Sequence, residues 1–343
     1  MVLFRADGNS IIGMGHVMRC LSIAEAFKRS GETCLFALAD DGMSAVITSR
    51  GFDFVSFESD YRNPMNEIGL IKELVRFRKP RLLVVDSYYV TDVYLRELME
   101  FVTTVVIDDL LSTAYPVDVL INYNVYADSE AYKKLYAECG VQLPRLLLGT
   151  EVVPLREEFS NLPITVTHRE CAKVLLSTGG ADSLHLAIGM AKYIVNNCGG
   201  DGIEYILLIG PLNTDKDEIE SIISGNENIS TRYNVKDMPS LIQSCDIVLS
   251  AAGSTLYEIC ACGVPLVTYV IADNQGAGAK MFEEAGLAIN CGVINCENVE
   301  KCFSAINELK SNQSLRRSMK RKMRELIDGN GANRIVAFLN HIV

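Results

Sequence analysis

Short, mainly apolar runs recur along this chain with room for a helix between them. Residues 82–86 and 104–108 are the clearest, since neither alternates apolar with polar side chains. Such runs are typical of parallel strands that are buried on both faces. They alternate with segments of helical apolar spacing, such as residues 17–29. This alternation predicts repeated β-α-β units, and therefore parallel sheets covered by helices on both sides.

The pattern restarts after a polar stretch at residues 160–169. At about 150 residues per domain, a chain of 343 residues suggests two domains. We therefore expect an α/β protein with two doubly wound, Rossmann-like domains facing a cleft, residues 1–158 and 159–343. It stays open whether the last helices, in the block 297–342, cross back to the first domain. The expected strands are residues 2–7, 33–39, 52–57, 82–86, 104–108, 118–123, 145–149, 173–177, 204–209, 246–250 and 265–270.

The charge balance limits the partners of this protein. Lys and Arg number 32 against 43 Asp and Glu, which gives a net charge of −11. Phosphate backbones and anionic membranes bind net basic surfaces, so we expect no nucleic acid and no membrane as a partner. No apolar stretch approaches the roughly 20 residues that span a bilayer. One anionic small molecule, held by local Arg side chains and backbone N–H groups, remains compatible with this charge.

Eleven cysteines are scattered singly along the chain, and none forms a C-x-x-C pair. Cys260 and Cys262 have no second pair with which to complete a zinc site. Isolated thiols are typical of a reducing compartment, and the N-terminus lacks the basic-then-apolar layout of a signal peptide. We therefore expect a cytoplasmic protein without a bound metal. We also expect a monomer, because one active site per chain needs no partner subunit.

The ligand site of an open α/β sheet lies beyond the carboxyl ends of its strands. The first strand runs there into a loop with Gly13 and Gly15, whose backbone can approach a ligand closely, ahead of a helix N-terminus that suits an anion. This loop is not the dinucleotide-binding G-x-G-x-x-G, because Met18 stands at the third glycine position. No Lys follows the glycines as in a P-loop. NAD and ATP are therefore disfavoured, and we expect no cofactor.

His16 follows this loop directly and is one of four histidines. A lone histidine is more often a packing or capping residue. The positive end of a helix, however, disfavours the imidazolium and leaves a neutral ring that can accept a proton at pH 7. The other three are placed less well: His168 lies in the expected linker, His185 starts a helix elsewhere, and His341 is terminal. His16 is therefore the candidate general base.

The second half carries a motif suited to a nucleoside diphosphate. Gly253-Ser254-Thr255 begins a helix after a strand, so its N–H groups and hydroxyls can hold a diphosphate. Glu258, one turn further on, can accept two hydrogen bonds from a vicinal diol such as a ribose. A helix cap would use the same residue types, and the two interpretations are compatible. Asp182, after Gly179-Gly180, could likewise cap a helix, and residues 234–238 could offer backbone groups to a base edge.

These residues carry a family resemblance. The run from Gly253 to Pro265, with Asn274-Gln275 downstream, resembles the nucleotide-sugar site of two-domain GT-B glycosyltransferases, such as the UDP-N-acetylglucosamine transferase of lipid II synthesis. The opening from Arg5 to Arg19 narrows this. It is similar to the hydrolases of pseudaminic acid biosynthesis, which are GT-B-like enzymes that cleave UDP-2,4-diacetamido-2,4,6-trideoxy-β-L-altropyranose with water in place of an acceptor. The similarity continues in order through residues 86–88, 108–109, 120–124, 155–159 and 178–182.

The resemblance implies a role for each matched position. His16 would be the general base for water attacking the anomeric carbon, with inversion and departure of UDP. Glu258 would bind the ribose, Ser254 the pyrophosphate, and Val235 to Met238 the uracil. The remaining substrate-binding residues would be Gly13, Gly15, Arg19, Asp86, Tyr88, Asn122, Asn124, Arg156, Asn274 and Gln275. The remaining UDP-binding residues would be Gly179, Gly180 and Gly253.

Three other functions remain open. A GT-B glycosyltransferase would deliver the sugar to a lipid or protein, although the first half shows no obvious apolar and basic patch for a lipid. A non-catalytic subunit would bind a UDP-sugar without turnover. A nucleotide-sugar 2-epimerase would share the architecture, but its usual charged cleft residues are not evident in this sequence. Release of UDP without any acceptor distinguishes the hydrolase from the transferase.

Overall fold

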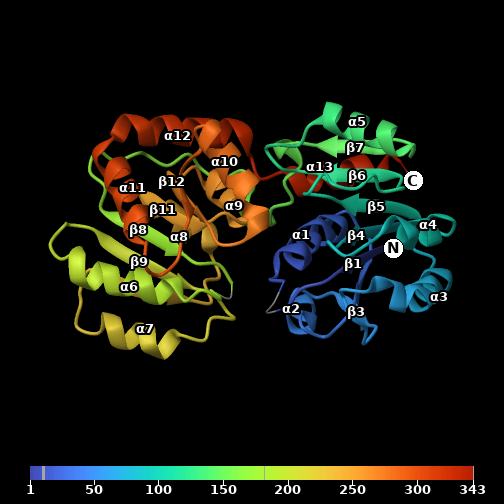
Figure 1. The fold of residues 1–343 in the computed structure, drawn as a ribbon, viewed down its shortest axis with the longest axis horizontal. Coiled ribbons are helices and arrows are strands. Elements are labelled where there is room, and N and C mark those ends of the chain that lie inside the picture. The colour runs from blue at the N-terminus through green and yellow to red at the C-terminus, as the bar shows by residue number, and fades with distance from the viewer. Residues whose placement is uncertain (10–11, 181, 343) are drawn as a thin grey trace. The chain divides into compact units, whose positions relative to one another are not determined.

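The computed structural model describes residues 1–9, 12–180 and 182–342, except for the side chain of Asn274. The chain forms two compact units (Figure 1). Unit 1 comprises Met1–Glu157 and Asn330–Val343, and unit 2 comprises Glu158–Gly329. The first crossing lies beside the expected boundary at 158/159, whereas the return at 329/330 assigns the last helix to unit 1. Residues 159–343 therefore do not form a single domain.

Unit 1 is built on a seven-stranded sheet of parallel strands in the order β3-β2-β1-β4-β5-β6-β7. The strands β1, β4 and β5 have little or no polar alternation, and helices cover both faces of the sheet (Figure 1). The strands are β1 Val2–Ala6, β2 Cys34–Leu38, β3 Asp53–Ser56, β4 Leu82–Asp86, β5 Thr103–Ile107, β6 Val119–Asn122 and β7 Arg145–Leu148. The helices are α1 Gly15–Arg29, α2 Ser44–Ser49, η1 Pro64–Glu67, α3 Ile68–Arg78, α4 Asp92–Met99, α5 Ser129–Cys139, η2 Thr150–Val152 and α13 Gly331–Asn340.

Unit 2 has a six-stranded sheet, also parallel, in the order β10-β9-β8-β11-β12-β13. Its strands are β8 Lys173–Ser177, β9 Glu204–Ile209, β10 Ile229–Tyr233, β11 Ile247–Ala251, β12 Leu266–Val270 and β13 Ala288–Val293. Its helices are η3 Glu157–Phe159, α6 Leu186–Asn197, α7 Lys216–Ile223, α8 Met238–Gln243, α9 Thr255–Cys262, η4 Asp273–Gln275, α10 Gly276–Glu284, α11 Glu300–Ser311 and α12 Gln313–Leu326. The two parallel sheets confirm the predicted fold class.

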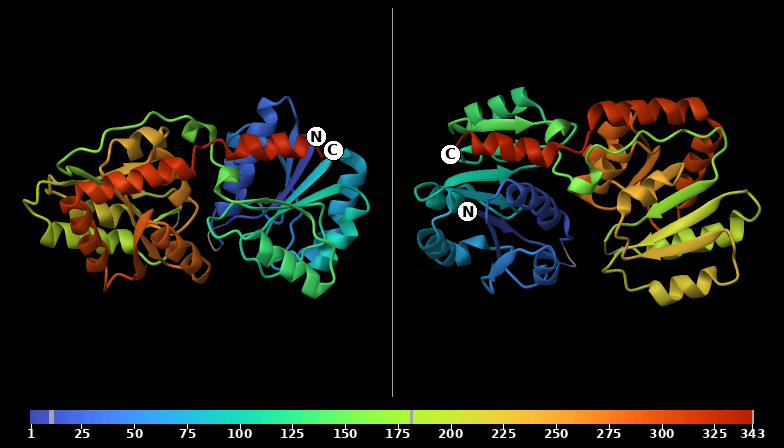
Figure 2. Two further views of the ribbon diagram at one scale, coloured as in Figure 1. Left: turned by 90° about the horizontal axis from the view of Figure 1, so that it is seen from above. Right: turned by 180° about the vertical axis from the view of Figure 1, so that it is seen from behind.

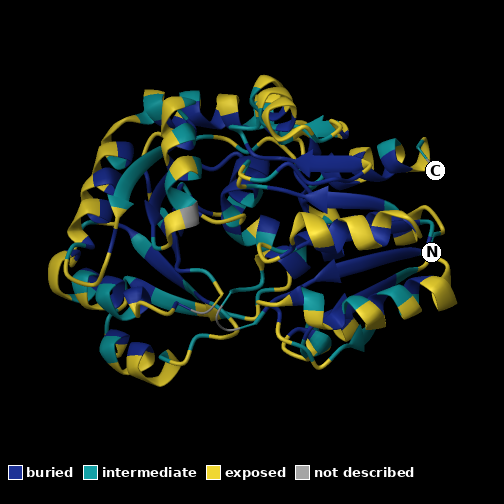
Figure 3. Cartoon of the chain, turned by 45° about the vertical axis from the view of Figure 1, so that its right-hand side comes forward, coloured by how far each residue is buried: buried dark blue, intermediate teal, exposed yellow. Residues whose placement is uncertain are grey.

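Two strands of unit 2 were not predicted from the sequence. Both β10 and β13 lie at an edge of the sheet, where one side of the strand lacks a neighbour. Only Ile229 in β10 and Ala288 in β13 are buried. An edge strand buries less apolar surface than a central strand, so its sequence lacks the apolar run that marks the others. Figure 3 shows this difference as the dark blue of the central strands against the paler edges.

The C-terminal helix α13 packs on unit 1, although it follows unit 2 in the sequence. Figure 2 shows it in the same unit as the N-terminal strands. Arg29 of α1 donates a hydrogen bond to Asn333 at 2.9 Å, and Arg334 donates one to the backbone oxygen of Glu151 at 2.9 Å. A side chain at Gly331 would meet the backbone oxygen of Val153 at 2.1 Å. The chain therefore returns to unit 1 through a contact that only glycine allows.

Candidate active site

The candidate site of unit 1 starts from two neighbouring strands. β1 pairs directly with β4, although β2 and β3 separate them in the sequence. The loop after β1 leads into α1, whose first turn carries His16, and β4 ends at Asp86. Parallel pairing brings both carboxyl ends to the same edge of the sheet. The strand order therefore brings together two residues that lie 70 positions apart.

His16 and Asp86 form a close pair. His16 Nδ1 lies 2.6 Å from Asp86 Oδ1, and the Tyr88 ring packs edge-on against the imidazole at 4.4 Å between centroids. A carboxylate only accepts hydrogen bonds, so this contact assigns the proton of the neutral ring to Nδ1. Nε2 then keeps its lone pair, and no residue in the described part of the chain forms a hydrogen bond with it. The pair has the form of a base and the carboxylate that orients it.

Arg19 keeps Asp86 ionised inside the protein. Asp86 has no exposed surface, and the Arg19 guanidinium donates to both of its oxygens, from Nε to Oδ2 at 2.5 Å and from Nη2 to Oδ1 at 2.6 Å. Burial by itself would raise the pKa of Asp86. The charge of Arg19, with a smaller contribution from His16, outweighs burial and lowers this pKa to about 2. Asp86 therefore remains an acceptor for His16 at neutral pH.

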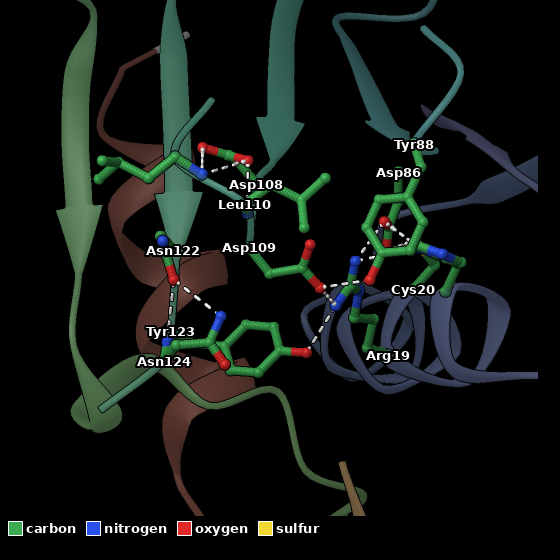
Figure 4. A network of polar contacts seen from close by, with 12 residues as sticks. Arg19, Cys20, Asp86, Tyr88, Asp108, Asp109, Leu110, Asn122, Tyr123 and Asn124 are labelled. Atoms are coloured by element: carbon green, nitrogen blue, oxygen red, sulfur yellow. Dashed lines mark hydrogen bonds and ion pairs between the residues drawn. The ribbon is translucent and has the colours of Figure 1, made fainter. Parts of the chain in front are cut away.

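The network extends from Arg19 to the ends of β5 and β6 (Figure 4). Nη1 of Arg19 donates to Asp109 Oδ2 at 2.9 Å and to the Tyr123 hydroxyl at 2.7 Å. The Tyr88 hydroxyl donates to the same oxygen of Asp109, also at 2.9 Å. Arg19 thus connects Asp86, the partner of His16, with Asp109, which follows the neighbouring strand β5.

A second set of hydrogen bonds lies beside this network and joins Asp108, Asn122 and Tyr132. Asp108 accepts hydrogen bonds from the backbone N–H groups of Leu110 and Leu111 and from the Tyr132 hydroxyl at 2.6 Å. Burial raises the pKa of Asp108 above its usual value. Asn122 Nδ2 contacts the Tyr132 hydroxyl at 2.9 Å, while its Oδ1 accepts from Asn124. These contacts hold the loops after β5 and β6 in place.

Three of the expected substrate-binding residues bind other protein groups. Asp86 and Asn122 are fully buried, and their side chains contact His16 and Tyr132, respectively. Arg19 is 8% exposed and its guanidinium is shared among Asp86, Asp109 and Tyr123. The substrate roles of these three residues stay predictions.

Asn124 and Arg156 lie at different places in unit 1. Asn124 is 8% exposed and follows β6, where its side-chain amide donates to Asn122. Arg156 is half-buried and lies in the segment that leads out of unit 1. Its substrate role stays a prediction.

The glycine loop before α1 closes on itself. Asn9 and Gly13 exchange two backbone hydrogen bonds, at 3.1 and 2.9 Å, and Gly13 has φ +77°, a conformation that favours glycine. Ser10 and Ile11 lie outside the described residues. Gly15 opens α1, and a side chain there would meet no atom within 4 Å. Met14, at the N-cap, provides no side-chain cap, so the first N–H groups of α1 are open to an anion or water.

In unit 2, the loops after β8 and β9 meet through their backbones. Gly179 has φ +88°, and Leu212 N donates to the oxygen of Gly180 at 3.0 Å. A side chain at Gly210 would lie 2.3 Å from the oxygens of both Gly179 and Gly180. Asp182 caps α6, since its two oxygens accept from the N–H groups of residues 186 and 187 at 2.9 Å each. The capping interpretation of Asp182 is therefore confirmed.

The Gly253 loop lies at the carboxyl end of β11. Gly253 and Ser254 are exposed, a side chain at Gly253 would meet no atom within 4 Å, and α9 begins at Thr255. Ser254 occupies the N-cap without a side-chain hydrogen bond to the helix. Glu258 lies in the first turn of α9 and is half-buried. The loop thus presents backbone N–H groups and a hydroxyl at one helix N-terminus.

The other expected binding residues of unit 2, for UDP at 235 and 238 and for the substrate at 274 and 275, lie on separate loops. Val235 and Met238 are half-buried before and at the start of α8, where Asp237 caps the helix through Ser240 N at 3.0 Å. Gln275 Oε1 accepts from Ile271 N at 3.0 Å and so closes its own loop. The side chain of Asn274 lies outside the described part. The binding roles of these residues stay predictions.

Asp109 and Tyr123 are the members of the network to which the sequence assigned no role. Asp109 was visible as a strand-end carboxylate in the matched pair Asp108-Asp109. Its link to His16 depends on Arg19 and Tyr88, which come from other segments.

Within the described residues, no group of three or more His, Cys, Asp or Glu side chains is arranged to hold a metal ion. No described helix is long and apolar enough to span a membrane.

This chain is similar to one family model and to several known proteins. The family model described as glycosyltransferase family 28 C-terminal domain matches residues 173–335. The spore coat polysaccharide biosynthesis protein SpsG of Bacillus subtilis is 22% identical over 343 residues, 98% of this chain and 97% of that protein. The UDP-2,4-diacetamido-2,4,6-trideoxy-β-L-altropyranose hydrolase of Campylobacter jejuni is 30% identical over 197 residues, 56% of this chain and 64% of that protein.

A further relative, uncharacterized protein MJ1062 of Methanocaldococcus jannaschii, is 23% identical over 273 residues, 76% of this chain. The match spans only 54% of that protein. Among solved structures, MurG of Acinetobacter baumannii superposes with a TM-score of 0.70 at 12% identity, covering 99% of both chains. The protein therefore has the two-domain GT-B fold that its sequence predicts.

Proposed function

We propose that this protein hydrolyses a UDP-linked sugar at its anomeric carbon. The observation that carries this proposal is the His16–Asp86 pair, in which a buried, ionised carboxylate orients a histidine whose Nε2 forms no hydrogen bond with any described residue. Such a pair can take a proton from water. The proposed substrate is UDP-2,4-diacetamido-2,4,6-trideoxy-β-L-altropyranose, and the name of the Campylobacter jejuni relative supports this choice.

The proposed reaction is a single displacement. His16 Nε2 removes a proton from a water molecule while the water oxygen forms a bond to the anomeric carbon. The bond from that carbon to the diphosphate oxygen breaks, and UDP leaves with the bonding electrons. One displacement inverts the configuration of the sugar. Asp86 stabilises the imidazolium that forms, and its contact with Nδ1 keeps the ring in position.

Unit 2 supplies the groups for the UDP part in this proposal. The N–H groups at the start of α9 and the Ser254 hydroxyl suit the diphosphate, which gains negative charge as it departs. Glu258 is assigned to the ribose, and residues 235–238 to the uracil. The match of residues 173–335 to the glycosyltransferase 28 C-terminal domain supports a nucleotide-sugar role for this unit. All eleven cysteines are free thiols, as is typical of a reducing compartment, so we place the reaction in the cytoplasm. The proposed substrate assigns the reaction to pseudaminic acid biosynthesis.

The test is hydrolysis in ¹⁸O-labelled water, with the products identified by mass spectrometry. Label in the free sugar, with unlabelled UDP, is the expected result and means cleavage of the anomeric C–O bond. Label in UDP would mean attack at phosphorus and would overturn the role of His16. Absence of turnover, combined with tight UDP binding, would favour a binding subunit.

A glycosyltransferase is the second candidate, and one surface feature favours it. Residues 76–79, at the end of α3, are all exposed, and Phe77 between Arg76 and Arg78 is 80% exposed. Arg76 also lies over the Phe101 ring at 4.8 Å. Exposed aromatic and basic side chains suit a lipid interface. The expectation that the first half lacks an apolar and basic patch stays a prediction. UDP release at full rate without an acceptor would exclude a strict transferase.

A further inference from the structure

One carboxylate oxygen in the His16 network has no partner among the described residues. Asp109 Oδ2 accepts from both Arg19 and Tyr88, at 2.9 Å each. Asp109 Oδ1 forms no hydrogen bond or ion pair with any of the described residues. The Asp109 side chain is 14% exposed, and Oδ1 is not one of the fully buried side-chain atoms that lack a partner. A carboxylate oxygen of this kind can accept a hydrogen bond from a ligand or from water.

Asp109 lies next to the proposed base. Tyr88 connects the two, because its ring packs on the His16 imidazole while its hydroxyl binds Asp109. Arg19 makes the second connection, since its Nη2 donates to Asp86 Oδ1, the oxygen that pairs with His16 Nδ1, and its Nη1 binds Asp109. A sugar whose anomeric carbon stands before His16 would therefore bring its ring substituents close to Asp109.

The charge of Asp109 decides which part of a nucleotide sugar can meet it. A carboxylate repels the diphosphate, so Oδ1 does not suit the UDP portion. It suits a neutral group that donates a hydrogen bond, such as an amide N–H or a hydroxyl. Asp108 does not compete for this role, because it is 4% exposed and its oxygens already accept from two backbone N–H groups and Tyr132.

We propose that Asp109 is a specificity-determining residue whose Oδ1 accepts a hydrogen bond from an N–H or O–H substituent of the sugar. This inference rests on the proposed function, because it places the sugar before His16. Arg19 and Tyr88 hold the other oxygen and so fix the direction of Oδ1. The substrate class is thereby narrowed to nucleotide sugars with a donor group, such as an acetamido substituent, within reach of that oxygen.

The test compares binding of UDP with binding of UDP-sugars by titration calorimetry. All variants carry His16→Asn, which is expected to slow turnover, and the probes are UDP, UDP-N-acetylglucosamine and the proposed UDP-diacetamido sugar. Asp109→Asn is expected to weaken binding of the preferred UDP-sugar about 10- to 100-fold, since a hydrogen bond to a charged group is lost, while UDP affinity changes less than about twofold. Asp128→Asn is the matched control, because Asp128 caps α5 outside the network and Asn also caps helices.

Each outcome decides the proposal. Equal loss of UDP and UDP-sugar binding, or no change in either, would overturn it. If neither sugar binds more tightly than UDP before Asp109 is changed, unit 1 holds no sugar and the proposal also fails. If only UDP-N-acetylglucosamine binds more tightly than UDP, the proposed substrate is wrong, and the affinity ratio for that sugar still tests Asp109. Should Asp109→Asn not fold, Asp109→Glu keeps the charge beside Arg19, displaces the acceptor and is expected to lower the same ratio.

Discussion

The residues that follow the strands differ in chemical character between the two units. In unit 1, residues after β1, β4 and β5 are charged or aromatic side chains that bind one another, with Arg19 between Asp86 and Asp109. In unit 2, the loops after β8, β9 and β11 are lined by glycines and by backbone N–H groups. The same parallel architecture thus carries a network of bonded side chains in unit 1 and loops with glycines and backbone N–H groups in unit 2.

This difference corresponds to two kinds of molecular task. A base must be held in one orientation and one tautomer, and a buried network of ionised groups provides that. A diphosphate is strongly charged and has several acceptor oxygens, so backbone N–H groups at helix N-termini can bind it without a dedicated cation. We therefore expect variants of unit 1 to lower turnover and variants of unit 2 to lower nucleotide affinity.

The largest effect is expected for His16→Asn. Removal of the base should lower kcat roughly 10²- to 10⁴-fold, while the Kd for UDP changes less than about threefold. Single-turnover assays and calorimetry measure the two quantities. His341→Asn, near the C-terminus and outside the network, serves as the control. A His16→Asn protein with full turnover would show that unit 1 does not carry the chemistry.

Asp86→Asn should follow, with a fall in kcat of roughly 10²- to 10³-fold, because an amide no longer selects the Nδ1–H tautomer. UDP affinity should remain unchanged. If kcat stayed within twofold of wild type, the buried carboxylate would not orient the base.

The same substitution tests a dependence of stability on pH. The pKa of Asp86 is about 2 in the folded protein, against an ordinary value of 3.8. Its ionised form therefore stabilises the fold above pH 4, and this contribution of about 2 kcal/mol is lost as the pH falls from about 4 to 2. Urea denaturation at several pH values should show a smaller acid-induced loss in Asp86→Asn than in wild type.

Substitution of two glycines of unit 2 separates an effect on nucleotide binding from an effect on stability. Gly253→Ala should lower UDP affinity about tenfold without a change in Tm, because open space surrounds this position and a methyl group would occupy the proposed diphosphate site. Gly210→Ala should instead lower stability by about 1–3 kcal/mol, since its methyl group would overlap two backbone oxygens. Thermal melts and calorimetry on both variants separate the two effects. Unaltered UDP binding in Gly253→Ala would contradict the assignment of the loop.

The smallest effect is expected for Glu258→Ala. Loss of the ribose contact should raise KM up to about tenfold and leave kcat within about twofold, because the ribose is distant from the bond that breaks. Initial-rate kinetics measure both constants. A large fall in kcat with unchanged KM would move Glu258 from nucleotide binding to catalysis and weaken the division between the units.

The central strands and the candidate base could be predicted from local sequence. Residues 82–86 and 104–108 bury both faces, and His16 stands at a helix N-terminus, so short-range patterns identify them. The edge strands β10 and β13 could not be predicted in this way, because their partial exposure removes the apolar signal. The return of α13 to unit 1 likewise depends on long-range packing, at Gly331 against Val153.

The sequence by itself determined the α/β class, the division into two sheets and the loops that carry chemistry, because apolar periodicity and glycine placement are local properties. Only the tertiary structure decided which of those loops meet. The order β2-β1-β4-β5 makes neighbours of strands that are distant in the chain, and it thereby pairs His16 with Asp86 and links both to Asp109. Burial then distinguishes the two carboxylates, since Asp86 is fully enclosed while the Asp109 side chain is 14% exposed, and on this difference the proposed roles of the two residues rest.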